Sequence, residues 1–326
     1  MSLSDKIFQI SSEQEFNTVA LEIFQFQYQN NELYRNYCDL IKAKPSEIKA
    51  LKQIPFLPIA FFKSHTIKTT EFKDEAVFLS SGTTGENQSK HHVKNLKIYE
   101  DSFFNSFKQF YGNVNDYCIL ALLPSYMERE GSSLIYMMEK IIAKNNHPKS
   151  GFYLDDFNGL IELLKELGTH QQKTLLFGVS FALLDLAEAF QIDLSHVIIM
   201  ETGGMKGRRK ELTRTELHHL YQQSFHVKTI HSEYGMTELL SQAYSKGNGI
   251  FETPPWMKII VRDINDPFSY LAPQKTGGIN VIDLANIYSC SFIATQDLGK
   301  IQPNNTFEVL GRFDNSDLRG CNLLIG

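Results

Sequence analysis

The sequence predicts an α/β protein with a mainly parallel sheet and flanking helices. Short apolar runs at 117–123, 174–177 and 197–200 are typical of strands that are covered on both faces. Segments with helical spacing separate them, and this alternation is the pattern of a parallel sheet. With 326 residues, 42% of them hydrophobic, the chain can bury a large core. We expect one structural unit with two parts, an α/β core at 1–255 and a β-rich subdomain at 256–326.

Local signals place the remaining elements. Ser12 and Glu15 form a capping-box pattern that predicts the first helix. Pro55 and Pro58 exclude a helix interior between them, and an apolar run predicts a strand at 76–79. Further helices are expected at 132–143, 157–167, 181–190 and 208–224. Further strands are expected at 227–230, 256–261, 278–282 and 307–310.

Composition and charge exclude several classes of protein. The formal charge of −5 predicts no global attraction to nucleic acids or anionic membranes. No apolar run is long enough for a membrane span, and residues 1–10 lack a signal-peptide pattern. The cysteines are far apart, without a CxxC pair, so neither a zinc site nor a disulfide framework is expected: Cys38, Cys118, Cys290 and Cys321. We therefore expect a protein of the reducing cytoplasm.

A loop rich in glycine and hydroxyl groups follows the strand predicted at 76–79. Its backbone N–H groups and hydroxyls can donate to phosphate oxygens, and its glycines allow close approach of an anion. It is not a Walker A loop, because GxxxxGK[ST] is absent. A plain surface turn explains the same composition equally well. The residues are Ser80, Ser81, Gly82, Thr83, Thr84 and Gly85.

A second polar segment, residues 231–238, follows the strand predicted at 227–230. Ligands of α/β proteins bind beyond the carboxyl ends of parallel strands. Here Thr237 can donate to a phosphate, and Glu238 supplies the hard oxygen that Mg²⁺ prefers. The alternative is a loop in which both residues begin a helix.

Residues 201–210 form a third segment, in which Gly203 and Gly204 follow a strand and four basic residues come next. Positive charge opposes the dipole at a helix start, so this placement hints at an anionic partner. A solvated helix start is the alternative. Residues 295–299 and 311–321 each have the composition of a polar turn.

Taken together, the five segments resemble the adenylate-forming superfamily of acyl-CoA synthetases, luciferases and adenylation domains. The resemblance implies that residues 80–85 bind phosphate, that Thr237 contacts the α-phosphate and that Glu238 binds magnesium. Gly203 and Gly204 match the segment that borders adenine. The remaining implied nucleotide contacts are Tyr234, Gly235 and Met236 of the YGxTE motif, and Asp297 and Arg312 on the ribose; Asp314 takes the hinge position.

A closer resemblance is to the LuxE-type acyl-protein synthetases, which activate fatty acids for a reductase. It is carried by residues 54–65, 123–133, 202–206 and 310–323, and so covers almost the whole chain. It implies the large domain of an adenylate-forming enzyme, with ATP and Mg²⁺ as cofactors. The implied reaction activates a carboxylic acid, with a fatty acid favoured, as acyl-AMP and releases pyrophosphate.

The sequence departs from the superfamily pattern in two places. It ends five residues after Cys321, whereas typical members continue into a domain with a catalytic lysine, so we expect a shortened enzyme. The usual proline-lysine-glycine ending of the phosphate loop is also replaced. We expect Lys206 and Lys90 to supply the positive charge, ahead of Arg129, Arg208 and His92. A solvated surface position is the alternative for each.

The acyl acceptor is the remaining question. The family resemblance implies a cysteine near the C-terminus, and Cys321 lies near Arg319, which favours the thiolate. The other cysteines are expected to be core residues. An acyl pocket is expected around Tyr126, Gly178 and His231. The alternatives are transfer to coenzyme A, a carrier protein or a reductase, and a non-catalytic subunit that binds ATP or acyl groups.

Overall fold

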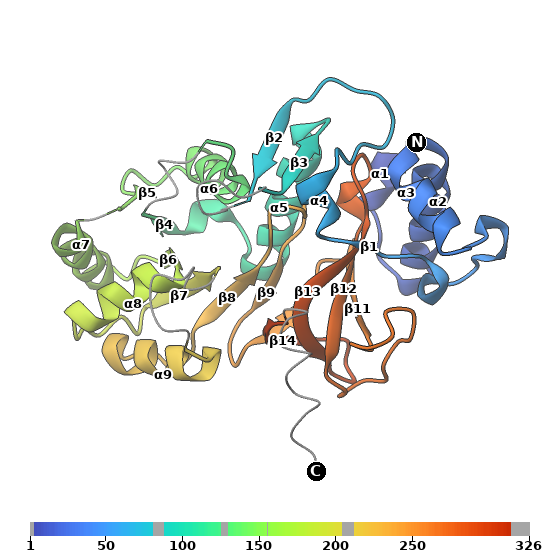
Figure 1. Ribbon diagram of the computed structural model, residues 1–326. Helices are drawn as coiled ribbons and strands as arrows, with labels where there is room; N and C mark the ends of the chain where they lie inside the picture. Colours follow the sequence, from blue (N-terminus) through green and yellow to red (C-terminus); the bar gives the residue numbers. More distant parts are fainter. Residues whose placement is uncertain (1–2, 81–87, 125–129, 155, 204–211, 314–326) are drawn as a thin grey trace, which may run out of the picture. The chain divides into compact units, whose positions relative to one another are not determined.

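The chain divides into two compact units, each discontinuous in sequence. The computed structural model describes residues 3–80, 88–124, 130–154, 156–203 and 212–313 (Figure 1). Unit 1 comprises Met1–Val77, Gly82–Leu96 and Glu252–Gly326, and unit 2 comprises Phe78–Ser81 and Lys97–Phe251. Each unit has strands and helices of its own.

Unit 2 contains the predicted parallel sheet. Its strand order is β10-β9-β8-β7-β6-β4-β5. The strands from β5 to β8 run parallel, and β9 returns antiparallel to β8. The bounds are β4 Cys118–Leu122, β5 Gly151–Phe152, β6 Thr174–Val179, β7 Val197–Thr202, β8 His231–Tyr234, β9 Ala243–Ser245 and β10 Ile250–Glu252. All side chains of β4 and β6 are buried, which explains their continuous apolar sequences.

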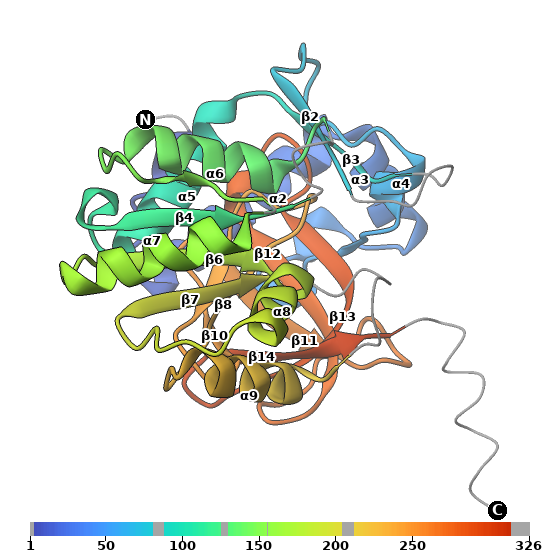
Figure 2. The ribbon, with the colours of Figure 1, turned by 90° about the vertical axis from the view of Figure 1, so that its left-hand side faces the viewer.

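Helices cover both faces of this sheet, as the alternation of elements predicts. Right-handed crossovers place α8 and α9 on one face and α6 on the other, an arrangement that Figures 1 and 2 show. The bounds are α5 Leu96–Tyr111, α6 Ser133–Lys144, α7 Phe157–Thr169, α8 Ser180–Ala189 and α9 Arg214–Phe225. The fold class predicted from the sequence is therefore confirmed.

Unit 1 combines the N-terminal helices with an antiparallel sheet. Strands β11, β12, β13 and β14 pair in chain order, and the short strand β1 adds to β13 in parallel. The helices are α1 Leu3–Ile7, α2 Glu13–Asn30, α3 Glu32–Leu40 and α4 Phe61–Ser64, with 3₁₀ turns at Pro45–Glu47, Leu51–Gln53 and Leu284–Asn286. The strands are β1 Leu57–Pro58, β3 Lys90–Val93, β11 Met257–Arg262, β12 Gly277–Asp283, β13 Phe292–Ile301 and β14 Phe307–Arg312.

Several local signals act as expected. The Ser12 hydroxyl accepts from the backbone of Glu15, and the Glu15 carboxylate accepts from the backbone of Ser12, which completes the capping box of α2. Strand β2 spans Ala76–Leu79, the bounds that the apolar run predicts. A further 3₁₀ turn at Val114–Asp116 precedes β4 in unit 2. Strong local signals of capping and apolar runs were therefore sufficient for these elements.

Other expectations were wrong. The strand expected at 227–230 lies at His231–Tyr234, because the pairing with β7 begins at His231 opposite Met200. The predicted helix at 208–224 begins only at Arg214, where Thr213 caps it. Residues 295–299 and 311–312 belong to β13 and β14 rather than to turns, because ladder pairing outweighs their polar composition. Helix α5 was missed, although Ile98, Tyr99, Phe103 and Phe107 are buried at helical spacing.

A buried glutamine of α2 ties the helical part of unit 1 to its sheet. The Gln27 amide donates to the carbonyls of Asn286 and Ile287, each at 3.0 Å, and accepts from the backbone of Ser291 at 3.0 Å. Its side chain is fully buried. Gln27 therefore satisfies backbone groups that no water reaches.

We predict that Gln27→Leu lowers the free energy of unfolding by about 2–4 kcal/mol, because it leaves these backbone groups without partners. Urea unfolding monitored by circular dichroism measures the change. Gln14→Leu, at an exposed position of the same helix, serves as the matched control and is expected to change stability by less than about 0.5 kcal/mol. Equal effects of the two substitutions would contradict the assigned role.

Candidate functional site

The carboxyl ends of β6, β7 and β8 lie side by side in unit 2. In the parallel register Val179 of β6 is opposite Thr202 of β7, and Thr202 is opposite Glu233 of β8. The sequence places Gly203 directly after β7 and Gly235 directly after β8. This edge is where open α/β sheets bind ligands. Two of the predicted nucleotide motifs therefore start at neighbouring strand ends.

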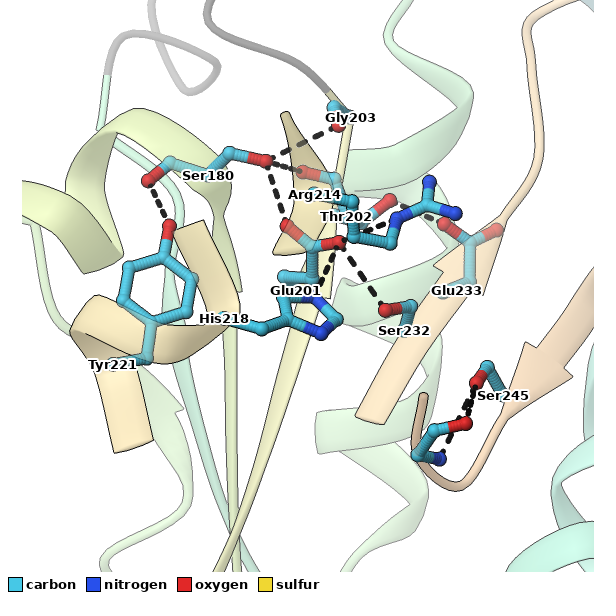
Figure 3. Close-up of polar contacts among 11 residues, drawn as sticks. Ser180, Glu201, Thr202, Gly203, Arg214, His218, Tyr221, Ser232, Glu233 and Ser245 are labelled. Atoms are coloured by element: carbon cyan, nitrogen blue, oxygen red, sulfur yellow. Dashed lines mark hydrogen bonds and ion pairs between the residues drawn. The ribbon is translucent and has the colours of Figure 1, made fainter. Parts of the chain in front are cut away.

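A buried carboxylate organises the end of β7 (Figure 3). Glu201 accepts hydrogen bonds from Ser180 at 3.1 Å and from Ser232 at 3.2 Å. His218 Nε2 lies 3.0 Å and Arg214 Nε 3.4 Å from the same carboxylate. Ser180 also donates to the carbonyl of Gly203 at 3.2 Å. The network therefore connects α8 and α9 to the first glycine of the predicted adenine segment.

The charge of Glu201 is matched by these partners. Burial favours the neutral acid, yet the hydrogen bond and charge of His218 and the charge of Arg214 hold the pKa of Glu201 below its ordinary value. A buried carboxylate that keeps its charge requires such partners. Tyr221 of α9 reinforces the same region by donating to the carbonyl of Ser180 at 2.6 Å.

Glu233, on the adjacent strand, has the opposite electrostatic character. It is fully enclosed, and burial raises its pKa to about 7 although the Thr202 hydroxyl, which donates to the carboxyl, acts in the other direction. Sequence reasoning missed Glu233, Glu201, Ser180 and His218 as members of the site. One sequence signal could have revealed them. A charged or hydroxyl-bearing side chain within a buried strand, or at its end, needs a hydrogen-bond partner close by.

The YGxTE motif consists of a strand end and a turn. Tyr234 is buried and packs edge-on against Phe251 at a centroid distance of 6.0 Å. The N–H of Leu239 donates to the carbonyl of Met236 at 3.1 Å, which closes a turn around Thr237 and Glu238. Glu238 is 7% exposed. Strand β9 follows this turn, so no helix begins at Thr237 and the alternative of a helix cap is wrong.

Two residues expected near an acyl group lie on the same sheet. The Nδ1 of His231 is 3.1 Å from the hydroxyl of Tyr111, and burial, with the nearby charge of Lys246, lowers the pKa of His231 to about 4. A Cβ atom on Gly178 would lie 2.8 Å from the Cγ of Leu183, so glycine permits close packing of α8 on β6. A role of either residue in acyl binding stays a prediction.

The predicted ribose contacts form an ion pair within unit 1. Asp297 of β13 is opposite Arg312 of β14, with 3.3 Å between the carboxylate and Nε. The Asp297 side chain is 10% exposed, whereas that of Arg312 is 76% exposed. The antiparallel ladder therefore brings together an acceptor for hydroxyl groups and a donor that solvent reaches.

The remaining predicted site residues are distributed as follows. Ser80 directly follows β2 and is half-buried, and Lys90 is exposed at the start of β3. His92 contacts Asp74 at 3.0 Å, which engages its ring within unit 1. Outside the described residues lie Ser81, Gly82, Thr83, Thr84, Gly85, Tyr126, Arg129, Gly204, Lys206, Arg208, Asp314 and Cys321.

The described cysteines have the character of core residues. Cys38, Cys118 and Cys290 are buried and unpaired. Burial raises the pKa of Cys38 and of Cys290 to about 12 and that of Cys118 to about 11. Their thiolates are therefore disfavoured at neutral pH, and the expectation that these three are core residues is confirmed.

The described residues contain no cluster of three or more His, Cys, Asp or Glu side chains that could hold a metal ion. No helix among these residues combines the length and apolar character that crossing a membrane requires.

Comparison with known proteins finds relatives among fatty-acid ligases. A family model described as "Acyl-protein synthetase, LuxE" matches residues 2–125. A "Long-chain-fatty-acid--luciferin-component ligase" of Aliivibrio fischeri is 23% identical over 93% of this chain and 85% of that protein. A protein of the same name from Vibrio harveyi is 21% identical over 92% of this chain and 84% of its own length.

Solved structures share the fold. An open conformation of 2-hydroxyisobutyryl-CoA ligase, in complex with 2-HIB-AMP and CoA, superimposes with a TM-score of 0.63 at 11% identity, over 94% of this chain and 72% of that one. ATP-bound MatB from Rhodopseudomonas palustris gives 0.55 at 17% identity, over 73% of this chain. The match covers 48% of MatB, so this chain spans about half of that protein's length.

The fold is therefore that of the adenylate-forming enzymes, as the motifs predict. The relation to the LuxE-type acyl-protein synthetases is also confirmed, and it classes the chain as a ligase.

We predict that His231 makes stability fall under acid conditions. Its pKa is about 4 in the folded chain and about 6.5 when unfolded, so the unfolded state binds more protons between these values. The stability difference between wild type and His231→Gln should therefore shrink from pH 6.5 to pH 4, by at most about 1.4 kcal/mol per pH unit. Urea titrations at several pH values measure it. With His219→Gln, at an exposed position of α9, the difference should stay constant. A constant difference for His231→Gln as well would contradict the prediction.

Proposed function

We propose that the protein uses ATP to activate a long-chain fatty acid as acyl-AMP, with release of pyrophosphate, and then transfers the acyl group to a thiol. The observation that carries this proposal is the placement of two nucleotide motifs at neighbouring carboxyl ends, Gly203 after β7 and residues 234–238 after β8. The relatives named as fatty-acid ligases support the choice of acid. The ATP-bound neighbour supports the choice of nucleotide.

The first step joins two anions. A carboxylate oxygen of the acid forms a bond to the α-phosphorus while the bond to the bridging oxygen of the β-phosphate breaks, and pyrophosphate leaves with that electron pair. No proton moves in this exchange. Fixed donors aimed at the developing charge lower the barrier. Thr237 and the hydroxyls of residues 80–85 are suited to this role, and Lys90 and Lys206 are the proposed cations.

The ribose is assigned to the ion pair in unit 1. Asp297 can accept from both hydroxyl groups of a ribose, and the exposed guanidinium of Arg312 can donate to its oxygens. The contact between the two side chains supports the assignment, because it orients the carboxylate before a nucleotide arrives.

The residues fit a magnesium ion bound mainly through phosphate. Mg²⁺ is held in such sites by one or two carboxylates together with phosphate oxygens and water. The buried Glu238, in the turn after β8, offers one such carboxylate. A bound Mg²⁺ would neutralise phosphate charge, and Glu238 would orient it.

For the second step we propose Cys321 as the acceptor. Its thiolate would attack the acyl carbonyl of acyl-AMP, forming a thioester as the bond to AMP breaks and AMP leaves. Arg319, two residues before Cys321 in the sequence, favours the thiolate, whereas the three described cysteines are buried with raised pKa values. A neighbour that binds CoA supports coenzyme A as the second candidate. From either thioester, the acyl group would then pass to a carrier protein or a reductase.

We predict that wild-type protein, ATP and Mg²⁺ catalyse pyrophosphate exchange that depends on a long-chain fatty acid. Glu238→Gln should reduce the rate at least about a hundredfold, because it removes the charge that orients the metal. Glu252→Gln, an exposed glutamate of β10, is the matched control and should retain the rate. Undiminished exchange in Glu238→Gln would refute the assignment of Glu238. No exchange with any fatty or aryl acid would instead favour a non-catalytic binding subunit.

We predict an acyl adduct on the protein after incubation with ATP, Mg²⁺ and a fatty acid. Intact-mass measurement should show the adduct in wild type and in Cys38→Ala, and hydroxylamine should release it. Cys321→Ser should abolish the adduct while pyrophosphate exchange continues. If turnover instead requires coenzyme A and no adduct forms, the thiol acceptor is external.

A further inference from the structure

The carboxyl group of Glu233 lies between the two glycine-containing segments of the site. One of its oxygens accepts a hydrogen bond from Thr202, the last residue of β7 before Gly203. Its other oxygen lies against the α-carbon of Gly235, where a Cβ atom would collide with it. One buried side chain thus contacts Thr202, as Figure 3 shows, and also Gly235.

The contact with Gly235 explains a motif residue. The structure gives Gly235 no left-handed φ, so its backbone is open to other residues. Space is the restriction: a side chain at this position would have to displace the Glu233 carboxyl, which is buried and accepts a hydrogen bond from the Thr202 hydroxyl. The glycine of the YGxTE motif therefore leaves room for the carboxyl of a residue two positions before it.

Thr202 is held from two directions. On the α8 side, the Ser180 hydroxyl donates to the carbonyl of Thr202 at 3.5 Å and to that of Gly203 at 3.2 Å, and it belongs to the Glu201 network. On the β8 side, Glu233 accepts from the Thr202 hydroxyl. The Glu201 network ties β7 to the helices, whereas Glu233 is the side chain that ties the end of β7 to the loop after β8.

The groups around Glu233 come from β7, β8, β9 and α5. His231 lies on the same face of β8, Tyr244 is opposite on β9, and Thr202 is adjacent on β7. Tyr111 of α5 contacts His231, and the charge of Lys246, the residue after β9, contributes to the lowered pKa of His231. Gln242 approaches the space beside Gly235. Burial raises the pKa of Tyr244, and the charge of Glu233 raises it further.

We propose that Glu233 is a positioning residue of the nucleotide site, which holds the Gly203 segment after β7 and the Gly235–Glu238 turn after β8 in one fixed relation. The inference rests on the proposed function, since it assumes that both segments bind ATP. Glu233 acts through Thr202 and Gly235 and has no assigned contact with the substrate. Burial favours the neutral carboxyl of Glu233. Ionisation of this group is therefore expected to weaken its contacts with Thr202 and Gly235.

A double-mutant cycle tests the contact between Glu233 and Gly235. Gly235→Ala should raise the KM for ATP at least about tenfold, because its Cβ displaces the carboxyl. In a Glu233→Ala background, the same change should raise KM less than about threefold, because the space is then free. Thr202→Val provides a second cycle if Gly235→Ala does not fold, and its effect should likewise vanish in Glu233→Ala. Thermal unfolding monitors the fold of each variant.

A pH profile separates positioning from a purely structural role. As the pH rises from 6 to 8, the KM for ATP of wild type should increase as Glu233 ionises. Glu233→Gln, which keeps shape and the hydrogen bond from Thr202, should show a flat profile, and Glu252→Gln should follow wild type. The raised pKa also means that the stabilising contribution of Glu233 is complete below about pH 4.5 and is lost as the pH rises through about 7.

ATP binding, measured by isothermal titration calorimetry, distinguishes a failure of the proposed function from a failure of the role proposed for Glu233. If wild type binds no ATP, the proposed function and this inference both fail. If it binds ATP and the mutational effects are additive, or Glu233→Gln keeps the wild-type pH profile, Glu233 is not a positioning residue while the proposed function stands. If the protein binds ATP but shows no pyrophosphate exchange, the Kd for ATP is measured instead of the KM in both double-mutant cycles.

Discussion

The carboxyl ends of β6, β7 and β8 in unit 2 depend on the interactions of one ionised carboxylate, that of Glu201. A charge at this depth costs several kcal/mol unless its partners are well placed. His218 and Arg214 on α9, Ser180 on α8 and Ser232 on β8 supply them. The same residues that match the charge therefore also fix where β7 ends, where α8 begins and how α9 lies against them. The network also fixes the carbonyl of Gly203 through Ser180.

Two neighbouring strands each bury a carboxyl group, but the pKa values of the two groups shift in opposite directions. Glu201 keeps its charge because cations and hydroxyls surround it, and its pKa is lowered. Glu233, one strand away, is bonded to a single hydroxyl among the contacts described, and its pKa is raised to about 7. Only the first is anchored by charge. The second can exchange a proton near neutral pH, at the point where the two glycine motifs approach each other.

The sequence predicted the fold class and most elements of unit 2, because β4, β6 and β7 are buried strands whose apolar runs are unambiguous. It misplaced β8 and missed β13. Both strands carry polar residues that an apolar pattern excludes: His231, Ser232 and Glu233 in β8, and Thr295 and Asp297 in β13. Tertiary pairing determines these strands. Val227 and Ile230 are buried as predicted, but they precede the ladder with β7 and do not belong to it.

Some of the residues that obscured these strands are also among those proposed for the site. Motif spacing predicts Thr237, Glu238, Asp297 and Arg312 as site residues, because those residues are recognisable by type. It could not find Glu201 or Glu233, whose importance lies in which strand lies next to which. A charged residue in an enclosed strand conflicts with local sequence preference, and such conflicts are tolerated where function requires them. Here each conflict has a physical resolution: a cation for Glu201, and a missing side chain at Gly235 for Glu233. The glycine of the nucleotide motif and the glutamate before it are therefore one structural feature, and a substitution at either position should be interpreted together with the other.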